Sequence, residues 1–231
     1  MSGTYDVIVV GGGLIGAVAA LGLAGAGRRV ALVDRARPES QPGRLGMDIR
    51  NIACSPASRE LLESVVSWDA LDAASYDRMV VWEELGTAAM TFTAQEARRR
   101  ELGWILENGP TLQMLWSAIE ANDRIEPVFG RVTAIEATEK EIQLTLDSAP
   151  LTGRLLLGVD GARSTVRELV NARQETLPTG QSALATVIRT AREHNNTAYQ
   201  RFRSEGPLAL LPGRDPTLSS VVWSQTPEQA A

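Results

Sequence analysis

The stretch that decides the fold is YDVIVVGGGLIGAVAALGLAGAGRRVALVD, residues 5–34. It predicts an apolar strand over residues 5–10, a glycine turn, a helix, and a second strand over residues 29–33 that ends at Asp34. A strand–turn–helix–strand unit with a terminal acid is typical of sites that bind the pyrophosphate and ribose of a dinucleotide. No Gly-Lys-Ser/Thr sequence follows the glycines, so the turn is not a nucleoside triphosphate loop.

The three spaced glycines have separate expected roles. Gly11 permits the tight turn after the strand, Gly13 lets the backbone approach a phosphate, and Gly16 lets the helix pack against the strand. The start of the helix adds free amide groups and the positive end of the helix dipole. Asp34, 18 positions after Gly16, can accept hydrogen bonds from both hydroxyls of an unmodified ribose. An ordinary glycine turn is the alternative, which the agreement of strand, helix, second strand and acid disfavours.

Composition narrows the class of protein. A chain of 231 residues with 44% hydrophobic and 22% charged residues is an ordinary globular protein, and its net charge of −5 offers no basic field for nucleic acid. The single cysteine, Cys54, fits a reducing cytosol and leaves no internal disulfide. The single histidine, His194, lies in a polar segment expected to be a turn, so neither a metal centre nor a Ser-His-Asp triad is expected. Without a transmembrane-length apolar span or a signal peptide, we expect a cytoplasmic protein.

The pattern changes after Asp34. A nicotinamide dehydrogenase would continue with strand and helix units, whereas here a Pro/Gly-rich loop and a short helical segment follow. Further on, the sequence predicts strands, one helix and then three closely spaced strands, over residues 79–84, 88–93, 110–120 (the helix), 131–137, 141–146 and 151–159. The last three indicate a β-meander inserted into the dinucleotide fold, which is frequent in FAD enzymes. The predicted fold class is α/β, a Rossmann-like FAD-binding domain with a second, β-sheet-rich substrate domain.

A second motif, LLLGVDGARSTVRE, covers residues 155–168. An apolar strand ends at Val159, Asp160 and Gly161 form a turn, and Ser164 can cap a helix. A turn at the carboxyl end of a strand can reach a ligand, although a plain Asp-Gly turn is the alternative.

These motifs together resemble the class A flavin-dependent aromatic hydroxylases, and most closely the hydroxylases of ubiquinone biosynthesis. The similarity runs over essentially the whole chain in the family's order. It is carried by GGGLIG, DIRNIACSPASRELLESVVSW, LENG, GVDGARSTVR and YQRFRSEGPLALLPGRDPTLSSVVWSQTPEQA.

The resemblance implies FAD as cofactor and NAD(P)H as co-substrate, with no catalytic side chain because the flavin carries the chemistry. It implies that Arg50 lies near the flavin, that the backbone of Val132 contacts adenine, and that Asp160 serves both FAD and the visiting nicotinamide. Arg50 could instead be a surface arginine and Val132 a core residue. The implied cofactor-binding residues are Gly11, Gly13, Gly16, Asp34, Arg35, Arg50, Val132 and Asp160.

The chain also departs from the family pattern. Gly109 and Leu112 stand where the family has an arginine or glutamine after its Glu-Asn pair, and Gln113 is displaced by one. Family members continue for more than a hundred residues beyond this sequence, so we expect the second domain to be incomplete at its C-terminus. The predicted domains are 1–72 with 105–175 for FAD, and 73–104 with 176–231 for substrate.

The implied function is hydroxylation of an aromatic ring, expected to be a polyprenylated phenol of ubiquinone biosynthesis. A biosynthetic complex or homo-oligomer and peripheral membrane contact are further expectations. Two alternatives stay open: an FAD-dependent dehydrogenase or oxidase, and a non-catalytic flavoprotein-like subunit.

Overall fold

The computed structural model describes residues 4–40 and 43–230, which form two compact units. Unit 1 holds residues up to 40, 62–67 and 110–175, and unit 2 holds the remainder. By packing, unit 2 holds three segments that the predicted FAD domain includes, residues 43–61, 68–72 and 105–109. The assignment of one domain to FAD and the other to substrate stays a prediction.

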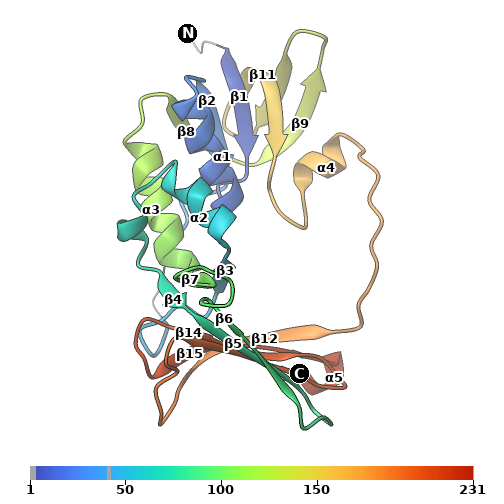
Figure 1. The fold of residues 1–231 in the computed structure, drawn as a ribbon. Coiled ribbons are helices and arrows are strands. Elements are labelled where there is room, and N and C mark those ends of the chain that lie inside the picture. Colours follow the sequence, from blue (N-terminus) through green and yellow to red (C-terminus); the bar gives the residue numbers. More distant parts are fainter. Residues whose placement is uncertain (1–3, 41–42, 231) are drawn as a thin grey trace. The chain divides into compact units, whose positions relative to one another are not determined.

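Unit 1 is built on a six-stranded sheet with the order β8-β2-β1-β11-β10-β9 (Figure 1). Its central strand β1 runs parallel to β2 and β11, and β2 runs parallel to β8. Strands β9, β10 and β11 are connected in antiparallel order, which is the predicted three-stranded meander. The strands are β1 (Tyr5–Val10), β2 (Val30–Asp34), β8 (Ile125–Phe129), β9 (Val132–Ala137), β10 (Ile142–Leu146) and β11 (Pro150–Gly158).

The core of unit 1 follows from the apolar runs of these strands. β1 and β2 are buried along almost their whole length, as expected for parallel strands covered on both faces. Helix α1 (Leu14–Gly25) buries small residues, with Gly16, Ala17 and Ala20 among them. The other helices of this unit are α3 (Asn108–Glu120), which begins in unit 2, and the short α4 (Thr165–Leu169).

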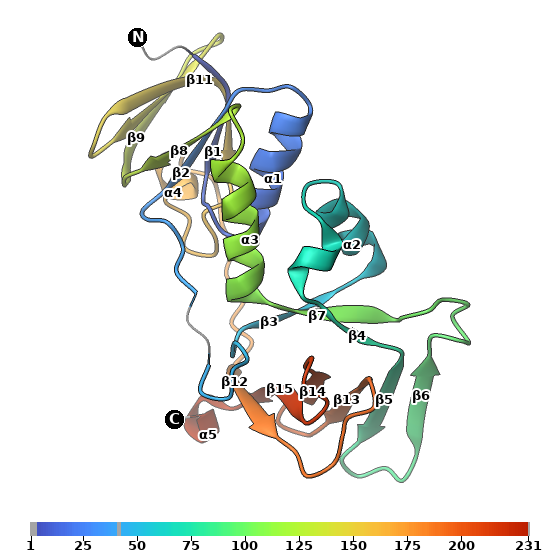
Figure 2. The same cartoon turned by 90° about the vertical axis from the view of Figure 1, so that its left-hand side faces the viewer.

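Unit 2 contains two sheets, which confirms the β-rich second part of the predicted fold. The larger has the order β12-β15-β14-β13-β5-β6, in which β13 and β5 run parallel and the other neighbours antiparallel. Figure 2 shows β5 and β6 as a hairpin at one edge of this sheet. The strands are β5 (Arg78–Glu83), β6 (Ala89–Thr93), β12 (Ser182–Arg189), β13 (Thr197–Phe202), β14 (Leu208–Pro212) and β15 (Leu218–Gln225).

The smaller sheet of unit 2 has the order β3-β7-β4. The guanidinium carbon of Arg59 lies over the rings of Trp68 and Trp104, 4.8 and 4.6 Å from their centroids, so its charge is attracted to both indoles. The remaining elements are β3 (Asn51–Cys54), α2 (Pro56–Glu63), a 3-10 helix η1 (Trp68–Leu71), β4 (Ala74–Tyr76), β7 (Gly103–Glu107) and α5 (Pro227–Ala230).

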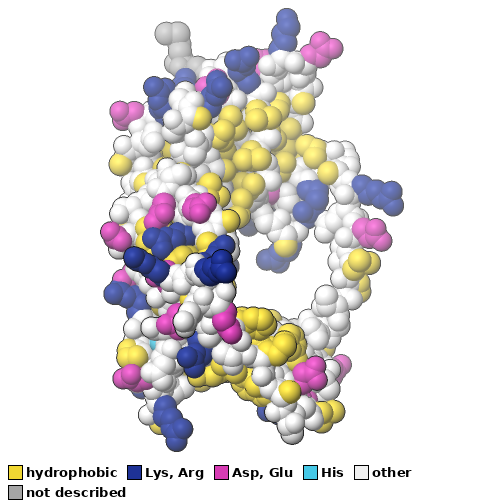
Figure 3. Space-filling view, viewed as in Figure 1, with side chains coloured by type: hydrophobic (Ala, Val, Ile, Leu, Met, Phe, Trp, Pro, Cys, Tyr) yellow, Lys and Arg dark blue, Asp and Glu magenta, His cyan; other side chains and the backbone are white. Residues whose placement is uncertain are grey.

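Two surface properties bear on function. Hydrophobic side chains gather over the larger sheet of unit 2, and Met90, Phe92 and Phe202 are among its exposed members (Figure 3). Among residues 4–40 and 43–230, no helix is both long and apolar enough to cross a membrane.

His194 lies in the predicted turn but is buried, with 7% of its surface exposed. Its Nε2 lies 3.0 Å from the carbonyl oxygen of Gly213, and its Nδ1 accepts a hydrogen bond from the amide of Asn196 over 3.1 Å. This pairing of both ring nitrogens with backbone groups gives the histidine a structural role in holding two turns of unit 2 together.

Candidate functional site

The glycine turn after β1 is closely packed at two of its three predicted positions. Gly11 has φ +111°, and a Cβ there would lie 2.5 Å from the carbonyl oxygen of Val159. A Cβ on Gly16 would lie 1.7 Å from the carbonyl oxygen of Gly11. Both positions therefore require glycine for the turn and helix to fit together. At Gly16 the backbone that a side chain would meet first is that of the turn, at Gly11, rather than that of the predicted strand.

Gly13 differs from these two glycines because its surroundings are open. It precedes α1 with φ −69°, and apart from Gly13 and its two chain neighbours no described atom lies within 4 Å of the position that a Cβ would take. Within the described residues, α1 has neither a side-chain cap nor an acid in its first turn. The positive end of α1 is thus left without an acid in the described first turn, and the space on the Cβ side of Gly13 is open, as a bound phosphate needs.

Asp34 ends β2 beside this turn. Its Oδ2 accepts a hydrogen bond from the amide of Gly12 over 2.6 Å, and its Oδ1 accepts one from the amide of Arg35 over 2.6 Å. A carboxylate has about four acceptor sites, so each oxygen keeps capacity for one ribose hydroxyl. The backbone of Arg35 thus orients the acid, while the Arg35 side chain is exposed.

Gly12 and Trp116 belong to the site although sequence reasoning missed them. The indole Nε1 of Trp116 donates to the carbonyl oxygen of Gly12 over 2.8 Å. A Cβ on Gly12 would lie 2.5 Å from Cζ2 of Trp116 and 2.9 Å from Oδ2 of Asp34. The contact spans 104 positions of sequence, so no local pattern could have indicated it.

The turn at Asp160 lies at the same edge of the sheet, because β11 runs parallel to β1 and next to it. Oδ1 of Asp160 accepts the hydroxyl of Ser164 over 2.5 Å, and Oδ2 accepts the amide of Thr165 over 2.6 Å. Ser164 Oγ in turn accepts the amide of Arg167 over 3.0 Å, which is the predicted helix cap. Asp160 therefore stabilises its own turn and the start of α4, as well as facing the adjacent pocket.

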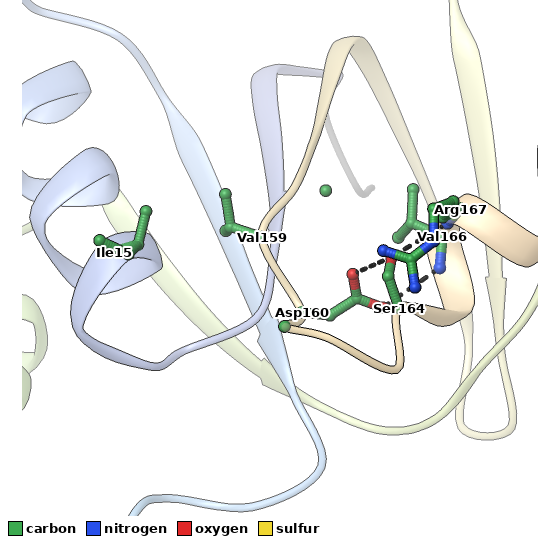
Figure 4. Close-up of a pocket in the computed structure, with 8 residues that line it drawn as sticks. Ile15, Val159, Asp160, Ser164, Val166 and Arg167 are labelled. Carbon is green, nitrogen blue, oxygen red and sulfur yellow. Dashed lines mark hydrogen bonds between the residues drawn. The ribbon is translucent and has the colours of Figure 1, made fainter. Parts of the chain in front are cut away.

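An open pocket of about 520 Å³ lies between the first turn of α1 and the Asp160 turn (Figure 4). Ile15, 70% exposed, is the α1 residue that lines it, and Asp160, Ser164 and Arg167 line it from the other motif. The two sequence motifs thus meet at one concave surface of unit 1.

The other predicted residues lie elsewhere. Val132, the first residue of β9, is 7% exposed and its side chain belongs to the hydrophobic core, which leaves its backbone for the predicted contact. Arg50 is exposed in unit 2, where its amide donates to Oδ1 of Asp48 over 3.0 Å. Gln113 accepts from Arg37 Nη1 over 2.5 Å and donates to the carbonyl of Pro38, so its side chain holds the loop after β2. The described part of the chain contains no group of three or more His, Cys, Asp or Glu suited to a metal ion.

Known proteins are similar to this chain over almost its whole length. The family model of FAD dependent oxidoreductases matches residues 6–159. The 3-demethoxyubiquinol 3-hydroxylase of Escherichia coli is 32% identical over 232 residues, and the human mitochondrial ubiquinone biosynthesis monooxygenase COQ6 is 34% identical over 249 residues. These alignments cover 96% and 98% of this chain but 58% and 52% of the relatives. The chain thus spans between half and three fifths of their length.

Solved structures show the same fold. A crystal structure of a PqsL mutant from P. aeruginosa superposes with a TM-score of 0.83 at 22% sequence identity. The match covers 99% of this chain and 62% of that one.

Proposed function

Because this chain belongs to the FAD-dependent oxidoreductase family, we propose that unit 1 binds the ADP half of FAD at the glycine turn. The open space at Gly13 carries the proposal, since that position has no packing reason to be glycine and a phosphate would fill the space. The amides at the start of α1 bind the pyrophosphate, and Asp34 accepts the ribose hydroxyls. The proposed contacts are Gly11, Gly13, Gly16, Asp34 and Arg35, with Arg50, the Val132 backbone and Asp160 as further ones.

Bound FAD would supply electron transfer from NAD(P)H and the activation of O₂. The residues of unit 1 bind and orient the cofactor, and their contribution is positioning rather than proton transfer. The full reaction is then hydroxylation of an aromatic ring, in which the bound flavin carries the chemistry.

We further propose a polyprenylated phenol of ubiquinone biosynthesis as the substrate. The names of the Escherichia coli and human relatives support this ring chemistry. The exposed hydrophobic side chains over the larger sheet of unit 2 suit an apolar tail. Such a substrate resides in lipid, so peripheral membrane association is part of the proposal. Assembly into a biosynthetic complex or homo-oligomer is proposed with it.

A titration of the chain with FAD, followed by flavin fluorescence, tests cofactor binding. We expect saturable binding that Asp34→Ala weakens by at least 10-fold, since the variant loses an acceptor for the ribose and the partner of the Gly12 amide. Asp123→Ala, at an exposed acid of the same unit, is the matched control and should bind FAD as the wild type does. A chain that retains no flavin would favour the non-catalytic alternative.

An activity assay separates the two enzymatic alternatives. The loaded protein is given NADH or NADPH, a prenylated phenol and ¹⁸O₂. Incorporation of one ¹⁸O atom into the ring supports the monooxygenase. NAD(P)H oxidation that continues with an artificial electron acceptor but yields no labelled phenol would identify a dehydrogenase instead.

A further inference from the structure

Trp116 contacts the glycine turn from helix α3. Its indole N–H donates to the carbonyl oxygen of Gly12 over 2.8 Å, and its side chain is fully buried. In a trans peptide the C=O and N–H groups point in opposite directions. Because Gly12 O and Gly13 N belong to one peptide, the bond to the indole turns the Gly13 amide away from Trp116.

The neighbouring peptide is fixed as well. The Gly12 amide donates to Asp34 Oδ2 over 2.6 Å, so Gly12 has both its N–H and its C=O held by side chains. Glycine has the greatest backbone freedom of any residue, and three consecutive glycines would otherwise sample many conformations. The two bonds therefore select one orientation of the turn before a ligand arrives, which lowers the entropic cost of binding.

We propose that Trp116 is a positioning residue of the phosphate-binding turn, which its indole N–H holds so that the Gly13 amide faces the diphosphate of the dinucleotide. The inference rests on the proposed function, namely that this turn binds FAD. It assigns Trp116 a part in diphosphate recognition and none in recognition of adenosine.

A packing role alone would predict something different. Trp116 also stacks on Phe129, with ring centroids 5.9 Å apart and an interplanar angle of 17°. Trp116→Phe keeps an aromatic ring at this position and removes the N–H donor. Phe129→Leu removes the stacking partner and leaves the donor in place, so the pair separates hydrogen bonding from packing.

The test measures FAD, ADP and adenosine binding to the 231-residue chain, the last two by displacement of FAD. We expect Trp116→Phe to weaken FAD and ADP binding by about 3- to 10-fold, the range for one net hydrogen bond, and to leave adenosine binding unchanged. Phe129→Leu should lower the melting temperature without changing the ratio of ADP to adenosine affinity. Trp82→Phe, in unit 2, controls for the loss of an indole as such.

Equal losses for ADP and adenosine, or no loss for either, would overturn the positioning role while leaving FAD binding by the wild type intact. Failure of the wild type to bind FAD or ADP would instead overturn the proposed function. If Trp116→Phe does not fold, the ¹⁵N-labelled indole resonance of Trp116 in the wild type decides. It should exchange slowly with solvent and shift when ADP binds but not when adenosine binds, and an unresponsive resonance would refute the inference.

Discussion

Replacing Gly16 by alanine should destabilise unit 1 and weaken FAD binding, whereas the same change at Gly22 of the same helix should do neither. A Cβ on Gly16 would lie 1.7 Å from the Gly11 carbonyl oxygen, and ordinary contact begins near 3.4 Å. Helix α1 and the turn would have to separate by about 1.7 Å (3.4 − 1.7). The obstacle is backbone, which cannot rotate aside as a flexible side chain would.

The magnitude follows from two opposing effects. Overpacking of a core contact costs about 1–3 kcal/mol of stability. Because the neighbour of Gly16 is rigid backbone, we expect Gly16→Ala to cost about 3 kcal/mol, the upper end of this range. Alanine regains about 1 kcal/mol of helix propensity, which leaves a net loss of about 2 kcal/mol. For a chain of this length that corresponds to a fall in melting temperature of about 4–8 °C. At Gly22 a Cβ meets no described atom within 4 Å apart from the helix's own backbone and the chain neighbours, so only the gain in propensity remains.

Thermal melts and FAD titrations of the two variants provide the assay. We expect Gly16→Ala to melt earlier and to bind FAD at least 10-fold more weakly, because the turn that carries the binding amides is displaced. Gly22→Ala should melt at or above the wild-type temperature with unchanged FAD affinity. A Gly16→Ala protein that melts and binds like the wild type would refute the argument from the collision.

Three further outcomes follow from the structure. Gly13→Ala should leave the melting temperature within about 1 °C of the wild type, because the added methyl meets open space. The same variant should bind FAD at least 10-fold more weakly. A fall in both melting temperature and FAD affinity would contradict the idea that the ligand, rather than packing, requires glycine here. Asp160→Ala should lower the free energy of unfolding by about 1 kcal/mol in urea titrations, because the start of α4 loses its hydrogen bonds to this carboxylate. An unchanged midpoint of urea unfolding would show that Ser164 caps the helix alone. Burial, followed by the hydrogen bond to Glu126, raises the pKa of Tyr5 from 10.0 to about 12. Between these pH values the phenol of the unfolded chain loses its proton while that of the folded chain keeps it, so the free energy of unfolding falls as pH rises. Tyr5→Phe should flatten this decline in urea titrations between pH 9 and 12.

The sequence allowed the local elements of the fold to be predicted. The strand, turn, helix and second strand of residues 5–34 are confirmed, as are the meander and the Ser164 cap. Each depends on residue types and periods within a short window. The family is likewise confirmed at the level of FAD-dependent oxidoreductases.

Long-range features could not be predicted in the same way. Nothing near Trp116 in the sequence indicates its bond to Gly12, and nothing near Gln113 indicates that the loop at Pro38 occupies its side chain. The capping of α4 by Asp160 was missed because an acid in an Asp-Gly turn is equally suited to a ligand. In each case the deciding partner is set by tertiary packing rather than by the local sequence.

The position of β1 between β2 and β11 has a consequence for biosynthesis. β2 follows β1 within a few tens of residues, but β11, whose end packs against Gly11, is reached only after residue 150. During translation the residues of the glycine turn are therefore synthesised long before Trp116 and Val159, which pack against the turn. The turn cannot take its final structure until both have left the ribosome. The proposed affinity for the dinucleotide therefore arises late, when β11, the last strand of the meander, is inserted beside β1.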